Sequence, residues 1–262
     1  MNVPRQASLV QTLSPAHSPS QNLLLAALPA AELDIISVDL ELVPMLLGDM
    51  LGKPGKAMSY AYFPTTAVVS LRYLTITGAL AETADVGLEG MVGVALFLGG
   101  DVTLSSALVK CGGHGYRLAP GRLAESFSSS ELLRSLLLRY TQALIAQIGQ
   151  TAACYRFHTI EQQLSRWLLS TFDRMPTGEL VMTQELVAGI LGVRRESITQ
   201  TATKLSDSGY IRYRRGHISI LDRAGLETRA CECYAVVKAE FQRLLPRTLA
   251  KSNCENVKSL YV

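Results

Sequence analysis

Residues 182–222 decide the fold of the C-terminal part, and they read MTQELVAGILGVRRESITQTATKLSDSGYIRYRRGHISILD. Thr183 is a residue type that caps helix N-termini well. Gly192 stands where a sharp turn between two helices needs a residue without Cβ. The apolar face of the first helix consists of Leu186, Val187, Ile190 and Leu191. The stretch therefore begins with a short helix and a tight turn.

A second helix is predicted from about residue 195 to residue 206. Ile198, Ala202 and Leu205 fall at i, i+4 and i+7 and are expected to face inward. The opposite face carries only polar side chains, namely Arg195, Glu196, Thr199, Gln200 and Thr203. Arginine suits guanine, glutamine suits adenine and glutamate suits cytosine in a major groove. This pattern is typical of a DNA recognition helix.

A basic β-hairpin is predicted directly after this helix. Gly209 is expected to end the helix, and apolar and polar residues then alternate on both sides of Arg215-Gly216. From Arg194 to His217 there are six Lys or Arg residues and two acidic ones. Such a hairpin would contact phosphates beside a groove. The predicted DNA-binding residues are Thr183, Arg194, Arg195, Glu196, Thr199, Gln200, Lys204, Arg214, Arg215 and His217.

The preceding half of the chain has a different texture. Glycines are frequent from Leu40 to Leu123, and β-rich runs occupy residues 60–63, 67–76 and 107–111. Short strands separated by glycine turns predict an antiparallel sandwich or barrel. Pro54-Gly55 fits a type II turn within it.

From Ser130 onward the glycines nearly vanish, and a long helix to about Phe157 is predicted. Its apolar stripe is formed by Leu133, Leu136, Leu137, Tyr140, Leu144, Ile145 and Ile148. Such a stripe packs either into the core of its own domain or against its twin in a dimer. The spacing leaves both interpretations open. A further helix is predicted over about 159–174, and one apolar helix, interrupted by Pro29, over 23–36.

With these features assembled, residues from about 40 to 225 resemble the Crp/Fnr family of transcription regulators. The strongest matches are the stretches 182–198 and 209–221, and Arg195-Glu196 matches the family's Arg-Glu reading pair. Two departures concern the operator sequence: Gln200 replaces a further arginine, and Arg194 stands where serine is common. The resemblance implies an α+β fold: a cupin-like, cyclic-nucleotide-binding-like antiparallel β-roll, a long dimerisation helix and a C-terminal winged helix-turn-helix. The expected divisions are a tail (1–21), the β-roll sensor domain (22–128), the dimerisation helix (129–158), the winged domain (159–226), and a C-terminal helix and tail (227–262).

The sensor domain departs further from the family. Gly90-Met-Val-Gly resembles the turn of a cyclic-nucleotide cassette, with Met91 where the family has glutamate. No arginine lies between Arg72 and Arg117, and Lys110 is the one lysine there. A buried cyclic phosphate would lack a cationic partner. We therefore predict that cyclic AMP is not used in the usual manner and leave the effector open. The candidate cassette residues are Gly90, Met91, Gly93, Thr103, Ser105 and Ser106.

Cysteines and composition point away from other classes. The net charge is only +3, and no uncharged apolar run is long enough to span a bilayer, so the cytoplasm is the expected location. No cysteine precedes Cys111, which speaks against the family's N-terminal iron–sulfur cluster. Cys231 and Cys233 are candidates for half of a metal or redox site, and Cys154 with His158 for a redox pair. Incidental thiols and helix packing are the preferred interpretations, with no metal, no cofactor and no enzyme activity expected.

The sequence thus predicts a homodimeric, sequence-specific transcription regulator. Two recognition helices about 34 Å apart would read a pseudo-palindromic operator in double-stranded DNA. RNA polymerase is a further candidate partner, and no membrane partner is expected. The alternative is a signal-binding module that regulates a protein partner without binding DNA.

Overall fold

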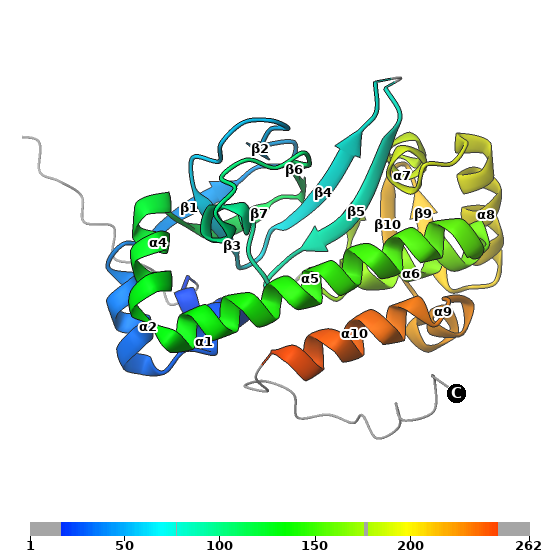
Figure 1. The fold of residues 1–262 in the computed structure, drawn as a ribbon. Helices are drawn as coiled ribbons and strands as arrows, with labels where there is room; N and C mark the ends of the chain where they lie inside the picture. The colour runs from blue at the N-terminus through cyan, green and yellow to red at the C-terminus, as the bar shows by residue number, and fades with distance from the viewer. Residues whose placement is uncertain (1–16, 77, 176–177, 246–262) are drawn as a thin grey trace, which may run out of the picture.

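A computed structural model describes residues 17–76, 78–175 and 178–245. An N-terminal lobe of two antiparallel sheets and a C-terminal lobe of short helices with a small sheet lie along one long helix (Figure 1). The first sheet has the order β1 (Glu41–Met45), β7 (Gly113–Leu118), β3 (Ala61–Pro64). The second has the order β2 (Met50–Gly52), β6 (Ser106–Cys111), β4 (Val68–Leu74), β5 (Leu80–Val86). The predicted α+β fold with an antiparallel roll is confirmed.

The β-roll is closed on several sides by short helical segments. They are η1 (Pro19–Gln21), α1 (Leu23–Ala26), α2 (Ala30–Ser37), α3 (Ala95–Leu98) and α4 (Pro120–Ser129). The predicted single helix over 23–36 is thus two helices, because Pro29 is the N-cap of α2.

The N-terminal segment is anchored to the roll by Asn22. This side chain is fully buried and donates hydrogen bonds to the carbonyls of Pro64 and Gly90, at 2.9 and 2.8 Å. Ser18 caps η1, so the end of the predicted tail is helical rather than irregular. The rest of that predicted tail, residues 1–16, lies outside the described residues.

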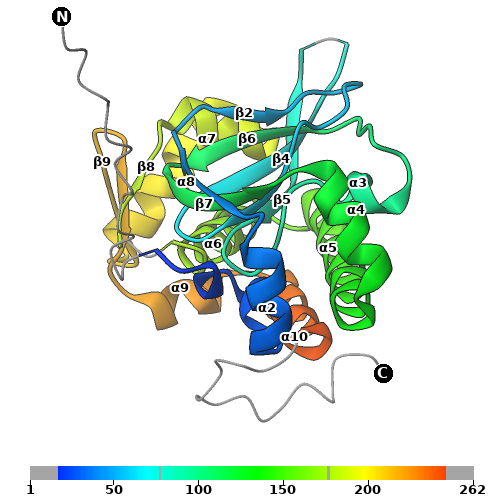
Figure 2. The same cartoon turned by 90° about the vertical axis from the view of Figure 1, so that its left-hand side faces the viewer.

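The long helix is α5 (Glu131–Phe157), and Figure 2 shows it beside the roll next to α4. Most of the predicted apolar stripe faces the core of its own chain, since Leu133, Leu136, Leu137, Tyr140 and Leu144 are buried. Ile145 is an exception and is 64% exposed. The core interpretation of the stripe is therefore correct for most of its members.

The C-terminal lobe begins with α6 (Ile160–Phe172), which confirms the helix predicted over about 159–174. It continues with β8 (Leu180–Val181), α7 (Gln184–Leu191), α8 (Arg195–Asp207), β9 (Ile211–Arg214), β10 (His217–Ile220), α9 (Arg223–Arg229) and α10 (Cys233–Leu244). The three strands form a sheet of order β8-β10-β9.

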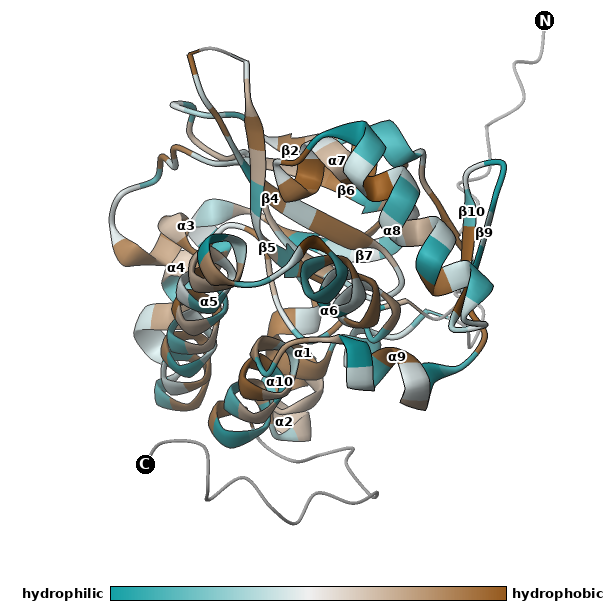
Figure 3. Cartoon of the chain, turned by 90° about the vertical axis from the view of Figure 1, so that its right-hand side faces the viewer, coloured by the Kyte–Doolittle hydropathy of each residue, from teal (hydrophilic) through white to brown (hydrophobic). Residues whose placement is uncertain are grey.

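The two lobes are packed against each other. Val68 and Cys111 of the roll belong to the same apolar cluster as Trp167 of α6. The helix α10 returns along α5 (Figure 1). It also contacts α6, and Figure 3, a view roughly along α5, shows α10 below both helices. At the far end of α10, the ring of Phe241 contacts Tyr140 at a centroid distance of 6.4 Å. The C-terminal helix therefore joins the small lobe to the roll.

Candidate nucleic-acid interface

The helix pair α7–α8 is built by local signals that the sequence displays. The Thr183 hydroxyl oxygen accepts a hydrogen bond from the Leu186 amide at 3.2 Å and caps α7. Gly192 ends this helix with φ +65°, a conformation that glycine adopts without strain. Ile198, Ala202 and Leu205 are buried, so α8 presents its polar side outward. The predicted helix-turn-helix and its inward face are confirmed.

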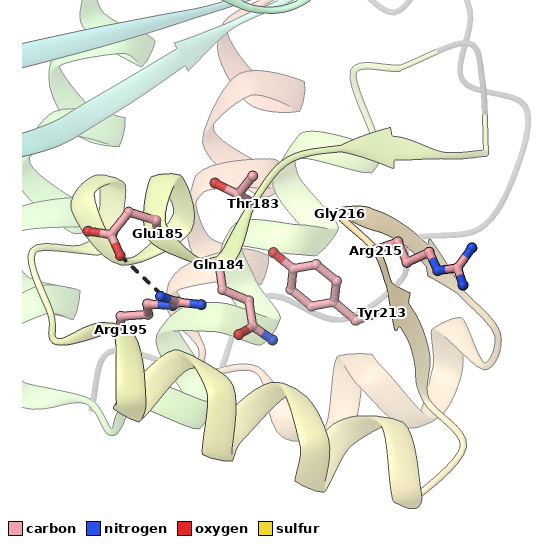
Figure 4. Close-up of a pocket in the computed structure, with 7 residues that line it drawn as sticks. All are labelled: Thr183, Gln184, Glu185, Arg195, Tyr213, Arg215 and Gly216. Carbon is pink, nitrogen blue, oxygen red and sulfur yellow. Dashed lines mark ion pairs between the residues drawn. The ribbon is translucent and has the colours of Figure 1, made fainter.

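The exposed face of α8 holds the predicted base-reading side chains, because Arg195, Glu196, Thr199 and Gln200 are all exposed. Thr199 donates a hydrogen bond to Gln184 Oε1 at 2.7 Å, which links α8 to α7. Arg195 Nε lies 3.9 Å from Glu185 Oε2 (Figure 4). This long, solvent-exposed ion pair is weak, so Glu185 would compete little with a DNA base for Arg195.

A hairpin wing follows α8. Arg214 pairs with His217 across the two-residue turn, and the turn residues Arg215 and Gly216 have φ +52° and +84°. Two left-handed residues are typical of a type I′ turn, whose twist matches the paired strands. The predicted turn position is therefore confirmed.

The wing is fixed to the start of α7 by two hydrogen bonds to one residue. Tyr213 Oη donates to the Met182 carbonyl at 2.9 Å, and the Met182 amide donates to the Gly216 carbonyl at 2.7 Å. A hollow of about 520 Å³ lies between α7, α8 and the hairpin. Its lining residues are Thr183, Gln184, Glu185, Arg195, Tyr213, Arg215 and Gly216 (Figure 4).

Some of the ten predicted DNA-binding side chains already have ion-pair partners within the protein. Lys204 Nζ lies 2.5 Å from Glu161 Oε2 of α6, and His217 Nδ1 lies 3.2 Å from Glu179 Oε2. Arg194 makes no side-chain cap, as its replacement of the usual serine implies. Arg214 and Arg215 are exposed on the wing, and the Arg215 side chain extends away from Arg195 (Figure 4).

Three residues of this surface were missed by sequence reasoning. Gln184, Glu185 and Tyr213 line the hollow beside Arg195. Gln184 and Glu185 could have been predicted, because they follow the Thr183 cap and therefore lie in the first turn of α7. Tyr213 reaches the hollow because the wing folds back onto Met182. The alternation of apolar and polar residues in the wing does not predict this contact.

The candidate cassette residues are engaged within the roll. Met91 is fully buried, and its carbonyl accepts a hydrogen bond from Tyr140 Oη at 2.8 Å. A Cβ on Gly90 would lie 2.5 Å from Tyr140 Oη, so the close approach of this tyrosine explains the glycine. Thr103 and Ser105 hydrogen-bond to each other at 2.7 Å, and Ser106 donates to the Arg72 carbonyl.

Lys110 is equally committed to internal contacts. Its Nζ lies 2.5 Å from Asp85 Oδ1 and 3.3 Å from Glu82 Oε1, with all three side chains buried. Burial alone would lower the pKa of Lys110, but attraction to Asp85 and Glu82 raises it. The ammonium group is thus neutralised by carboxylates in this structure.

Comparison with known proteins gives the same picture. Residues 162–229 match the family model of the Crp-like helix-turn-helix domain. These residues of the C-terminal lobe therefore form a Crp-like helix-turn-helix domain. No curated protein matches the chain.

Solved structures extend the likeness to the roll and the long helix. A transcriptional regulator of the Crp/Fnr family from Eubacterium rectale is 16% identical, with 80% of this chain and 98% of that chain covered and a TM-score of 0.63. FixK2 from Bradyrhizobium japonicum is 14% identical, with coverages of 73% and 98% and a TM-score of 0.63. A CRP/FNR-family regulator from Thermus thermophilus is 22% identical, with coverages of 72% and 98% and a TM-score of 0.60.

At these identities the solved structures establish the fold. The chain has the Crp/Fnr architecture, including its cyclic-nucleotide-binding-like roll. Together with the matched domain, this supports a DNA-binding transcription regulator. In the part of the chain that the structure describes, no helix combines the length and hydropathy needed to cross a membrane.

Proposed function

We propose that this Crp/Fnr-type protein is a sequence-specific regulator that places α8 in the major groove. The observation that carries the proposal is an exposed polar face of α8, formed by Arg195, Glu196, Thr199 and Gln200 next to a basic wing. The buried side of α8 fixes this face in one orientation. The wing arginines Arg214 and Arg215 would contact phosphates and set the register.

We further propose that the active form is a homodimer paired through α5. A second apolar stripe supports this, because Leu138, Ile145 and Ala152 recur every seven residues and are all exposed. Gln142 and Gly149 lie between them on the same exposed side. A heptad spacing with small residues is suited to close pairing of two helices. The twofold axis of such a dimer would match a pseudo-palindromic operator.

The effector of the roll would differ from cyclic AMP bound in the usual manner. The engagement of Lys110 by Asp85 and Glu82 supports this, since a cyclic phosphate would have to displace two buried carboxylates. Any effector would act by shifting the populations of two relative orientations of the lobes.

Selection of bound sequences from a random DNA pool tests the proposal. Purified full-length protein without added ligand is expected to enrich a pseudo-palindrome with half-sites about one helical turn apart. Binding to the enriched site is then measured against a scrambled site at several salt concentrations. Salt-sensitive binding without any enrichment would contradict sequence-specific reading by the ligand-free protein. A lack of binding to any DNA would contradict the proposal altogether.

A further inference from the structure

Four side chains of types that commonly bind metal ions lie close together where α5, α6 and α10 meet. Cys154, His158, Cys231 and Cys233 place one ligand atom each within 4.8 Å of all the others. Cys154 Sγ and Cys231 Sγ are 3.5 Å apart, and Cys233 Sγ lies 3.5 Å from His158 Nδ1. The three cysteines are almost completely buried and form an apolar cluster of their own. In the sequence they form two separate pairs, Cys154 with His158 and Cys231 with Cys233, and the fold brings the two pairs into contact.

The chain presents each pair in a way that suits ligation. Cys154 and His158 are four residues apart, so they share one face at the C-terminal end of α5. Cys231 and Cys233 flank Glu232, the N-cap of α10. The lengthwise packing of α10 on α5 brings the two pairs together. This arrangement depends on no residue of the DNA-reading surface.

The spacing matches a mononuclear tetrahedral site. Zinc–sulfur bonds of about 2.3 Å hold two sulfur ligands about 3.8 Å apart, and a nitrogen ligand lies slightly closer. Two of the separations are 3.5 Å and none exceeds 4.8 Å, so side-chain adjustments would admit a metal ion. An iron–sulfur cluster would need ligands that surround several iron atoms rather than a single point. From this geometry we propose that the four side chains form a Cys₃His site for Zn²⁺.

Groups around the four side chains support the assignment. His158 Nε2 lies 3.1 Å from Glu232 Oε1, which leaves Nδ1 directed toward the sulfurs. A carboxylate on the second ring nitrogen is the usual way in which proteins orient a metal-binding histidine. Gln150 Nε2 donates a hydrogen bond to Cys233 Sγ at 3.1 Å, which stabilises a thiolate. The Gln163 side chain donates to the His158 carbonyl at 2.8 Å and fixes the end of α5.

The charge balance is also favourable. Zn²⁺ with three thiolates and a neutral imidazole carries one negative charge, and the three thiol protons are released to solvent on binding. Arg166 of α6 is buried beside Cys154, and its Nε has no hydrogen-bond partner among the described residues. The nearby guanidinium would compensate the charge of the loaded site.

The position of the site gives it a structural consequence. His158 is the C-cap of α5, and α6 begins at Ile160 after a short connection. The other two ligands come from the junction of α9 and α10. A bound ion would therefore crosslink the end of the long helix to the C-terminal helix at the junction of the two lobes.

Metal content and a cobalt spectrum test this proposal. Full-length protein, purified under reducing conditions with Zn²⁺ and then desalted, is expected to retain one zinc per chain by mass spectrometry. Exchange with Co²⁺ is expected to give the visible bands of tetrahedral cobalt and the near-ultraviolet bands of thiolate ligation. Zinc affinity is measured by competition with a chromophoric chelator. None of these readouts requires DNA binding, so the result is independent of the proposed function.

Three variants locate the site. Cys233→Ser is expected to abolish the thiolate bands or weaken zinc binding at least tenfold. Glu232→Gln, at a half-exposed side chain outside the core, is expected to weaken binding roughly tenfold or more and remains informative if the cysteine variant misfolds. Cys111→Ser replaces a buried cysteine outside the cluster and is expected to retain one zinc. The proposal would be overturned by less than one zinc per chain in reduced protein or by equal zinc binding in all variants. An iron–sulfur spectrum, or a Cys154–Cys231 disulfide that persists under reducing conditions, would also overturn it.

Discussion

Lys110 Nζ lies 2.5 Å from Asp85 Oδ1, and both side chains are 4% exposed or less. The lysine also donates a hydrogen bond to Thr171 Oγ1 of α6 at 3.0 Å. Glu82, the second carboxylate near Lys110, accepts a hydrogen bond from Trp167 Nε1 of the same helix at 2.8 Å. A buried charge network of the roll thus forms one polar part of its contact with the C-terminal lobe, beside the ion pair of Arg174 with Glu89.

Lys110→Met is expected to destabilise the protein strongly. The substitution leaves Asp85 and Glu82 buried beside each other without the lysine that contacts both of them. Breaking a buried pair in this way typically costs about 3–5 kcal/mol. Urea unfolding monitored by the fluorescence of Trp167 would measure it. The control Lys56→Met, at an exposed lysine of the roll, is expected to change stability by less than about 0.5 kcal/mol. Equal stability of the two variants would contradict a structural role of the network.

Glu82 is expected to make stability depend on pH. Burial and the Asp85 carboxylate raise the pKa of Glu82 to about 7, against the attraction of Lys110. In the unfolded chain the pKa is about 4.3. The folded protein therefore binds more protons between these values. This contribution to stability is fully present below about pH 4 and is lost as pH rises toward 7.

Glu82→Gln removes this titration and keeps an oxygen acceptor for Trp167. The free energy of unfolding of the variant, relative to the parent protein, is expected to increase from about pH 4 to about pH 7 and then to level off. Urea unfolding at four pH values in this range measures the difference. Glu125→Gln, at an exposed carboxylate, serves as the control. A difference for Glu82→Gln that stays constant over the range would contradict the assignment.

Arg195→Ala is expected to weaken binding to the selected site by roughly 1–3 kcal/mol and to relax one base position. The reason is that Arg195 lies on the exposed face of α8 with only a loose partner in Glu185. Fluorescence anisotropy and a repeated selection measure both effects. Arg243→Ala removes the same charge from α10, far from this face, and is expected to bind normally. An unchanged sequence preference for Arg195→Ala would show that the recognition helix is placed wrongly.

Arg215→Ala is expected to weaken specific and random DNA about equally. The residue lies at the tip of the wing, and its side chain extends away from Arg195 (Figure 4). Loss of one phosphate contact reduces the dependence of log K on log salt by about one unit. Titrations at several salt concentrations on both DNAs measure the slope. A loss confined to the specific site would indicate base reading by the wing instead.

Ile145→Asp is expected to convert the dimer to a monomer without unfolding the chain. Ile145 is 64% exposed on α5, so a carboxylate there is tolerated in the monomer and costly in a paired helix. Sedimentation measures the oligomeric state, and circular dichroism checks folding. Ile76→Asp changes a fully exposed isoleucine of the roll and is expected to leave the dimer intact. A dimer that persists in the Ile145 variant would place the interface elsewhere.

Local signals made the C-terminal domain readable from the sequence. The Thr183 cap, the left-handed Gly192 and the Arg215-Gly216 turn are each set by a few neighbouring residues, and the structure confirms them. The stripe on α5 was ambiguous because a periodicity identifies an apolar face but not what covers it. The structure separates the two faces: Leu137 and Leu144 pack inside, whereas Leu138 and Ile145 face outward.

The helix α8, the wing, the antiparallel roll and the helix between them were predictable from the sequence, because caps, turns and periodicities act over a few residues. Contacts between side chains far apart in the sequence depend on the folded arrangement. The fold pairs Lys110 of β6 with Asp85 of β5 across the intervening strand β4. It also joins Cys154 and His158 to Cys231 and Cys233 through the packing of α10 on α5. Such contacts depend on the relative placement of whole elements, which is set by the shape of the shared core and leaves no local mark in the chain.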